Sequence, residues 1–254
     1  MKYMGSKARI AKHILPIMLQ EAEKHGITTW VEPFVGGANM IKNVQNEMIR
    51  IGYDKNVYLI EMYTHIQKNG FVYPEQISKE LYDACRTAYN TNSWYVGSQE
   101  VDASFIGWVG FMASANGRFF DGGFSGVSKT KIGTERNYID ESIRGLKKEF
   151  SDLQDVEFIS EDYLNLDFKD TLIYCDPPYK GTKTYNTSKN FDHEQFFNWC
   201  RHQSKNNIVY ISEYDAPEDF ECVWEQEVKS SLSANGVCGG NKVSIERLFK
   251  VSSK

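Results

Sequence analysis

The stretch Thr171-Leu-Ile-Tyr-Cys-Asp-Pro-Pro-Tyr179 joins a short apolar run to an acid, two prolines and an aromatic residue. The apolar run Thr171–Cys175 predicts a buried strand, and α/β enzymes keep their chemistry at the carboxyl ends of such strands. Each proline fixes its own φ and biases the preceding residue away from helix, so the loop is stiff. We therefore expect an α/β fold with a functional loop at a sheet edge, although Asp-Pro-Pro is also an ordinary turn.

The residue types of this loop suit the methylation of an exocyclic amino group on a flat base such as adenine. The lone pair of that nitrogen is delocalised into the ring, so two fixed acceptors are needed to draw the nitrogen towards tetrahedral geometry. The Asp176 carboxylate and the Pro177 carbonyl could each accept one amino hydrogen and stabilise the developing positive charge. Pro178 stiffens the loop, and Tyr179 offers a ring for stacking, worth about 1–3 kcal/mol per base.

The composition is that of an ordinary globular chain. Its 254 residues are 41% hydrophobic and 25% charged, which suits one large α/β domain with an insertion. No stretch approaches the roughly 20 apolar residues of a membrane span, and no apolar signal core follows the basic start, so we expect a cytoplasmic location. Cysteines and histidines lack metal-ligand spacing, so no metal is expected. The net charge of −5 argues against a nucleic-acid coat protein, but not against an enzyme with a local basic face.

A glycine turn follows the predicted strand Thr28–Glu32, in the sequence Pro33-Phe-Val-Gly-Gly-Ala-Asn39, and a helix is expected over Met40–Glu47. Strand, glycine turn and helix in this order form a nucleotide-type site, because glycines let the backbone approach a ligand closely. The spacing matches neither a phosphate loop nor a dinucleotide fingerprint. A nucleoside triphosphate and NAD are therefore not favoured.

Asp54 ends the next predicted strand, Ile49–Tyr53. An acid at this position commonly accepts hydrogen bonds from both hydroxyls of a ribose. The glycine turn and the acid together indicate an adenosine ligand without a pyrophosphate, and S-adenosylmethionine fits that description. Asp54 could instead cap a helix over Lys55–Gln67, or serve both roles.

The pattern changes between residues 71 and 150. Helical stretches at Glu75–Tyr89, Asp102–Ala113 and Asn137–Phe150 flank a segment rich in glycine, serine and aromatics, and no clear strand recurs. We expect residues 1–70 and 151–254 to form the main domain and residues 71–150 to form an inserted helical subdomain.

The centre of this insertion, Asn116–Gly126, combines an arginine with aromatic rings and flexible backbone. Arg118 could read a guanine edge through two hydrogen bonds, and Phe119 or Phe120 could wedge between bases. The alternative is that these rings anchor the loop to the core. Two groups of lysines could contact phosphates or simply be solvated, namely Lys129 and Lys131 beside this segment, and Lys180, Lys183 and Lys189 after Tyr179.

The strand pattern resumes after the insertion. Asp192 is expected to cap a helix reaching Arg201, with Gln195 as its capping-box partner. A long exposed hairpin is expected over residues 230–240. The remaining strands are predicted at Val156–Ile159, Asn207–Ser212, Glu221–Val228 and Lys242–Lys250.

Three motifs together give the chain a resemblance to the D12 class of N6-adenine DNA methyltransferases, the Dam-like group, and particularly to its small phage or mobile-element members. Tyr3-Met-Gly-Ser-Lys7 resembles the N-terminal aromatic, glycine and lysine signature of the family. Glu32-Pro-Phe-Val-Gly-Gly37 resembles its cofactor loop, and Asp176-Pro-Pro-Tyr179 resembles its catalytic loop. The motifs span nearly the whole chain in the expected order, with the insertion between them. Taken alone, Tyr3–Lys7 could be a flexible terminus.

The resemblance implies a Rossmann-like S-adenosylmethionine-dependent fold with a mostly parallel seven-stranded sheet, in which the insertion recognises the target. It implies direct methyl transfer from S-adenosylmethionine to N6 of a flipped adenine in a specific site of double-stranded DNA, in the cytoplasm of a bacterial host. Lys7 with Tyr3 would form the methionine end of the cofactor site, Asp54 would hold the ribose, and Asp162 would accept from the cofactor adenine. The implied residues are Asp176, Pro177, Pro178 and Tyr179 for catalysis; Tyr3, Lys7, Glu32, Phe34, Gly36, Gly37, Asp54, Asp162 and Asp176 for the cofactor; and Arg118, Phe119, Phe120, Lys129, Lys131, Lys180 and Lys183 for DNA.

The chain departs from the family pattern at two places. Ala38 stands where the family often has a third glycine, and Asn116–Gly126 differs from the GATC-specific enzymes, so GATC recognition is not implied. The alternatives are a cytosine N4 methyltransferase, which more often has serine at the position of Asp176, an RNA or protein glutamine methyltransferase, which usually has asparagine, and a catalytically silent DNA-binding relative. No cysteine stands where cytosine-ring methylation needs its nucleophile, because Cys175 lies within the predicted strand. The target sequence, a cognate restriction enzyme and the oligomeric state are left open.

Overall fold

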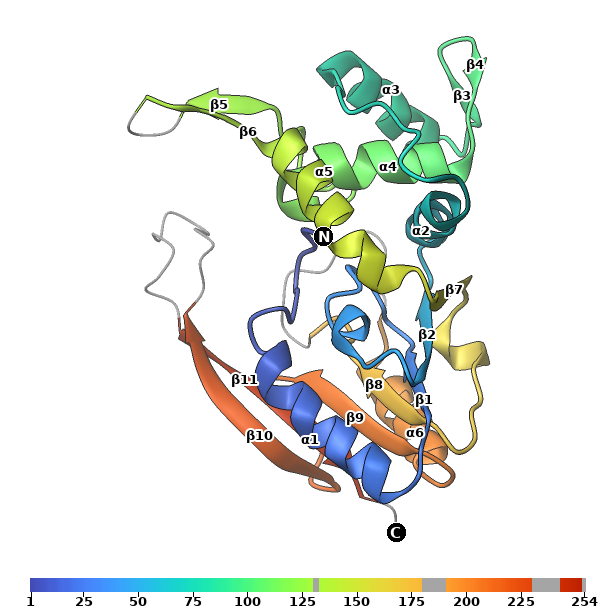
Figure 1. The fold of residues 1–254 in the computed structure, drawn as a ribbon, viewed down its shortest axis with the longest axis vertical. Helices are drawn as coiled ribbons and strands as arrows, with labels where there is room; N and C mark the ends of the chain where they lie inside the picture. The colour runs from blue at the N-terminus through green and yellow to red at the C-terminus, as the bar shows by residue number, and fades with distance from the viewer. Residues whose placement is uncertain (130–132, 180–190, 230–242, 253–254) are drawn as a thin grey trace.

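The computed structural model describes residues 1–129, 133–179, 191–229 and 243–252 (Figure 1). A seven-stranded sheet forms its centre, in the order β10-β11-β9-β8-β1-β2-β7. These strands are β1 (Thr29–Glu32), β2 (Ile49–Asp54), β7 (Val156–Ser160), β8 (Leu172–Cys175), β9 (Ile208–Glu213), β10 (Phe220–Lys229) and β11 (Val243–Val251).

The sheet is mainly parallel, as predicted. Neighbouring strands from β9 to β7 all pair in parallel, whereas β11 runs antiparallel to both β9 and β10. The strand β10 therefore points the same way as the parallel five, and β11 is the one reversed strand of this sheet. The mixed α/β architecture is consistent with a methyltransferase fold.

Two hydrophobic clusters cover the two faces of the sheet. Successive side chains of β8 point to opposite faces, so Leu172 and Tyr174 belong to one cluster and Ile173 and Cys175 to the other. The first cluster includes the buried face of α1 (Ala11–Lys24), and the second includes that of α6 (His193–Gln203), so the two helices lie on opposite faces (Figure 1). Cys175 is thus buried within its strand, as expected.

The remaining helices gather at one end of the sheet (Figure 1). Among the described residues, none of the helices is long and apolar enough to cross a membrane. The helices are α2 (Val57–Asn69), α3 (Lys79–Asn90), α4 (Ala103–Ala113) and α5 (Tyr138–Glu149), with short 3-10 turns η1 (Ile41–Asn43), η2 (Ala115–Gly117), η3 (Phe150–Leu153) and η4 (Tyr163–Asn165).

The helix expected over Met40–Glu47 does not form, and only the turn η1 is present. The side chain of Asn43 donates to the carbonyl of Asn39 at 2.9 Å, which takes an acceptor that a helix would need. Val44 is already extended, with ψ of 140°. The chain therefore leaves the turn towards β2 without building a helix.

The region expected to lack strands holds two short hairpins. They are formed by β3 (Tyr95–Val96) with β4 (Gln99–Glu100), and by β5 (Val127–Lys129) with β6 (Glu135–Asn137). Such short ladders leave no recognisable alternation in a sequence. At the other end of the chain β10 and β11 pair as predicted, while the segment 230–240 between them lies outside the described residues.

Helices α2–α5 share one continuous hydrophobic cluster with the sheet. Every residue of α4 from Ile106 to Ala113 is buried, and the cluster that contains Trp108 also contains Trp30 of β1. At Gly107 the backbones of α4 and α2 come so close that an added Cβ would overlap the carbonyl oxygen of Tyr58. Whether residues 71–150 form a separate subdomain therefore stays a prediction.

The close approach of α4 and α2 gives a stability test. We expect Gly107→Ala to lower the free energy of unfolding by about 1–3 kcal/mol, because the methyl group meets backbone and the helices must separate. Gly145→Ala on α5 is the matched control: nothing lies within 4 Å of its added Cβ, so a gain of about 0.5–1 kcal/mol is expected from helix propensity. Urea unfolding followed by circular dichroism measures both. Equal stabilities for the two variants would contradict the packing.

Candidate active site

The order of the strands brings the three motif loops together. β1 lies between β8 and β2 and is parallel to both, so the carboxyl ends of the three strands meet at one edge. The loop after β8 begins at Asp176, the loop after β1 begins at Pro33, and β2 ends at Asp54. This edge is where parallel α/β sheets bind ligands.

Lys7 joins the N-terminal motif to the loop after β8. Its ammonium lies 2.9 Å from Asp176 Oδ1 and donates to the carbonyl of Gly5 at 2.8 Å. It also lies 4.4 Å from the centre of the Tyr179 ring. The Lys7 side chain is only 7% exposed, whereas that of Asp176 keeps 22%, so the carboxylate can still be reached from outside.

The charge of Lys7 bears on the protonation of Asp176. Burial raises the pKa of the Asp176 carboxyl above its ordinary value, and the attraction and hydrogen bond of Lys7 act against that rise. The lysine therefore favours the carboxylate form, which is the acceptor form. The sequence had indicated Lys7 only for the methionine end of a cofactor site, and its contact with Asp176 is an additional finding.

Tyr3 packs on the glycine turn after β1. A Cβ on Gly36 would lie 2.8 Å from Tyr3 Cε1, and one on Gly37 would lie 2.5 Å from Tyr3 Cβ, so only glycine admits the tyrosine. The ring stacks on Phe111 of α4 with a centroid distance of 6.1 Å. Ala38, which is fully buried, adopts φ of +54°, and this left-handed backbone explains why glycine suits that position.

Asp54 anchors the glycine turn. One carboxylate oxygen accepts from the backbone N–H of Gly36 at 3.1 Å, and the other accepts from that of Asn56 at 2.9 Å. Burial raises the pKa of Asp54 to about 6, although both hydrogen bonds oppose the rise. The N-cap of α2 is Asn56, which accepts from the N–H of Tyr58 at 3.1 Å, so the helix-cap alternative for Asp54 is wrong.

Glu32 is buried below the turn and is 2% exposed. The indole of Trp30 donates to it at 2.9 Å. Burial raises its pKa well above the ordinary value, and the nearby Asp176 adds to the rise. Burial therefore favours the neutral form of the Glu32 carboxyl.

Phe34 and Asp162 lie towards β7 and α6. The Phe34 ring packs against those of Tyr163 and Phe196, with centroid distances of 5.1 and 5.6 Å. Asp162 follows β7, accepts from the N–H of Leu164 at 3.2 Å and lies 2.7 Å from the ammonium of Lys55. Asp162 thus lies near the end of β2, where it forms an ion pair with Lys55, the residue after Asp54.

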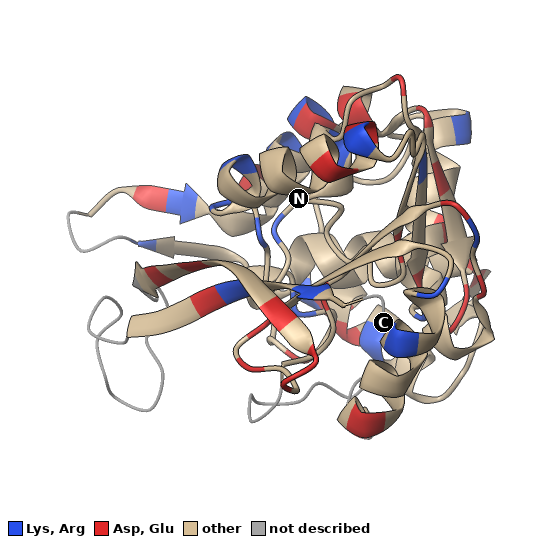
Figure 2. Cartoon of the chain, turned by 90° about the horizontal axis from the view of Figure 1, so that it is seen from below, with Lys and Arg blue, Asp and Glu red and all other residues tan. Residues whose placement is uncertain are grey.

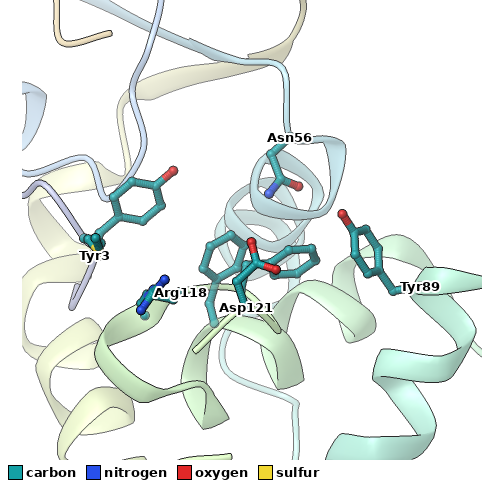
Figure 3. A pocket seen from close by; sticks show the side chains of 9 residues that line it. Tyr3, Asn56, Tyr89, Arg118 and Asp121 are labelled. Atoms are coloured by element: carbon teal, nitrogen blue, oxygen red, sulfur yellow. The ribbon is translucent and has the colours of Figure 1, made fainter. Parts of the chain in front are cut away.

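Arg118 lines a small pocket together with Tyr3 and Met4 of the N-terminal segment. Figure 3 shows Tyr3, Asn56, Tyr89, Arg118 and Asp121 around it. The cavity of about 50 Å³ holds a few water molecules but is too small for a nucleobase.

The two phenylalanines after Arg118 point into the core. Phe119 and Phe120 are 8% and 6% exposed. Phe119 stacks on Phe111 at 4.7 Å, and Phe120 lies 5.2 Å from Tyr82. This packing favours the anchoring alternative for both rings, because a ring that wedges between bases must be exposed.

The lysines expected to contact DNA are only partly described. Lys129 is exposed on β5. Lys131, Lys180, Lys183 and Lys189 lie outside the described residues. Acidic and basic residues are interspersed over the described chain rather than segregated on separate faces (Figure 2).

Two residues beside the loop were not predicted. The hydroxyl of Tyr179 donates to Glu246 Oε2 of β11 at 3.1 Å, and its ring meets that of Tyr214 edge-on at 4.6 Å. Neither residue belongs to a motif, and the alternation along β11 indicates only a strand. The described residues contain no cluster of three or more His, Cys, Asp or Glu that could hold a metal.

The comparisons with known proteins agree with the motifs. Residues 3–103 match the family described as D12 class N6 adenine-specific DNA methyltransferase. The matched span contains Tyr3–Lys7, Glu32–Gly37 and Asp54, whereas Asp176 lies beyond it. No curated protein matches the chain. The family match confirms the resemblance that the motifs indicate and supports the assignment of this protein as an adenine-specific DNA methyltransferase.

Proposed function

We propose that this enzyme transfers a methyl group from S-adenosylmethionine to N6 of an adenine that is flipped out of double-stranded DNA. The observation that carries the proposal is the cluster of Lys7, Asp176 and Tyr179 beside the glycine turn. It combines a reachable carboxylate, a cation that favours the ionised form of that carboxylate and a ring for stacking.

The glycine turn and Asp54 fit the cofactor. The absence of side chains at Gly36 and Gly37 lets Tyr3 lie directly against the turn, where its ring would border the cofactor. Each oxygen of Asp54 accepts one backbone N–H, and a carboxylate oxygen has a second lone pair for a ribose hydroxyl. Asp162 would receive the adenine amino group, Phe34 would line that end, and Lys7 and Tyr3 would border the methionine end. When bound, S-adenosylmethionine supplies an electrophilic methyl group.

The catalytic work of the chain falls on the loop after β8. Asp176 and the carbonyl of Pro177 would each accept one hydrogen of the target amino group, which frees the nitrogen lone pair to form the new N–C bond. As the N–C bond forms and the S–C bond of the donor breaks, positive charge would develop on N6; the Asp176 carboxylate would stabilise this charge and accept the departing proton. Pro178 stiffens the loop, and Tyr179 would stack on the base.

Target recognition is assigned to the insertion. Residues 1–70 and 151–254 would form the catalytic part, and residues 71–150 would bind the DNA site. Arg118 and Lys129 remain proposed DNA contacts, as do Lys131, Lys180 and Lys183. The rings of Phe119 and Phe120 would support the loop from the core rather than enter the duplex.

Substitution of Asp176 tests the mechanism. We expect Asp176→Ala to abolish methyl transfer and Asp176→Asn to lower it by at least about 100-fold, because a neutral group stabilises the developing charge poorly. Binding of S-adenosylmethionine should be largely retained by both variants. Transfer of labelled methyl groups to DNA and calorimetric binding measure the two quantities. Asp167→Asn, at an exposed acid that precedes β8 and pairs with His202, serves as the control and should behave as the unmodified enzyme.

Full transfer by Asp176→Ala would refute the mechanism. Identification of the methylated nucleoside, with DNA, RNA and protein offered side by side, tests the substrate. N4-methylcytosine, or a methylated RNA or protein, would refute adenine in DNA as the target.

The pKa of Asp54 gives a pH test of the ribose contact. A pKa raised to about 6 means that protonated Asp54 stabilises the unliganded fold at low pH, and that this stabilisation is lost as the pH rises through 6. A ribose that donates to the carboxylate favours the ionised form, so cofactor affinity should rise between pH 5 and pH 7. Asp54→Asn should weaken binding and flatten this profile, as measured by calorimetry over the same range.

Asp162→Asn provides the comparison for the pH test. We expect it to weaken cofactor binding while leaving the rise between pH 5 and pH 7 in place. A profile that stays equally steep in Asp54→Asn would show that another group titrates, and would refute the ribose role.

A further inference from the structure

The ring of Tyr179 is constrained by three different contacts. Its hydroxyl donates to Glu246 Oε2 at 3.1 Å. The ammonium of Lys7 lies over the ring, 4.4 Å from its centre. Tyr214 meets it edge-on, with ring planes at 84° and centroids 4.6 Å apart. The orientation of the ring is thus set before any base arrives.

Of these three contacts, the hydroxyl contact comes from the reversed strand of the sheet. Glu246 lies on β11 opposite Gln226 of β10, in the part of the hairpin beyond the ladder with β9, which ends at the pair Arg247 and Glu213. The next residue, Arg247, contacts the second tyrosine: its guanidinium donates to the backbone carbonyl of Tyr214. Consecutive residues of β11 therefore fix both tyrosines.

A hydrogen bond to the far end of the ring suits a positioning role. Stacking requires that the ring plane be parallel to the base, and a tyrosine has two side-chain torsions that can tilt it. An acceptor at the hydroxyl restrains that tilt without occupying the faces of the ring. Lys7 already covers one face, so a base would stack on the other face or replace the lysine.

We propose that Glu246 is a positioning residue for the target base, which acts by holding the hydroxyl of Tyr179 and thereby presetting the stacking plane. The inference rests on the proposed function, because it assumes that a base stacks on Tyr179. It adds a specific residue from β11, outside all three motifs, to the machinery of the transfer.

Substitution of Glu246 separates the hydrogen bond from other effects. We expect Glu246→Ala to lower kcat/KM for DNA about tenfold, with cofactor affinity unchanged, because the loss of a charge-assisted hydrogen bond has consequences of this size. Glu246→Gln keeps a neutral acceptor oxygen, so its loss of kcat/KM should be clearly smaller than that of Glu246→Ala. Glu221→Gln, at an exposed acid further along β10, is the matched control and should show no change.

Tyr179→Phe removes the same hydrogen bond from the other partner. It keeps the ring, so its loss of kcat/KM should equal that of Glu246→Ala, and the double variant should be no worse than either single one. Thermal melts of each variant exclude unfolding as the cause. If Glu246→Ala proves unfolded, Glu246→Gln and Tyr179→Phe still test the contact.

A spectroscopic readout reports the base directly. A duplex carrying the mapped methylation site, with 2-aminopurine in place of the target adenine, should show brighter emission with Glu246→Ala than with the unmodified enzyme, because a poorly stacked base is less quenched. Unchanged emission, additive losses in the double variant, or equal losses in Glu246→Gln and Glu246→Ala would each overturn the proposal. Failure of the proposed function is distinct, since the unmodified enzyme would then not methylate DNA.

Discussion

The ion pair between Lys7 and Asp176 is the contact around which the proposed site is organised. It joins residues from opposite parts of the chain inside a largely buried site, where the Lys7 side chain is only 7% exposed. Removing one partner of such a pair is costly, because it leaves a buried charge without compensation. The segment before α1 and the loop after β8 must therefore keep fixed positions relative to each other. Most of the surrounding packing holds them there.

These relative positions are fixed by segments whose backbones approach each other closely. The glycine turn admits Tyr3 because Gly36 and Gly37 carry no side chain, and Asp54 fixes the turn through the N–H of Gly36. On the opposite side the ring of Tyr3 stacks on Phe111 of α4. Lys7 follows Tyr3 by four residues, and this spacing places the Lys7 ammonium beside Asp176. The N-terminal motif thus makes two contacts, one with the glycine turn after β1 and one with the loop after β8.

Local patterns predicted most of the sheet and the loops that meet at its edge, because apolar runs, glycine turns and acids at strand ends are recognisable within a few residues. Strand β8 and the cap Asp192, which accepts from the N–H of Gln195 at 3.0 Å, are examples. The prediction of a helix after the glycine turn was wrong, because the side chain of Asn43 competes for the Asn39 carbonyl. Glu246 could not be predicted, since its contact with Tyr179 depends on how β11 lies beside the loop, which no local pattern encodes.

The N-terminal segment also joins the turn before Arg118 to the loops at the edge of the sheet. An added Cβ on Gly117 would overlap the carbonyl oxygen of Lys2, so the turn before Arg118 rests directly on this segment. Phe119 and Phe120 then pack into the cluster shared with the sheet. Any movement of the Arg118 loop therefore presses on the same few residues that carry Tyr3 and Lys7. The proposed DNA contacts would therefore have little freedom to move independently of the loops after β1 and β8, because all three regions contact the segment Lys2–Lys7.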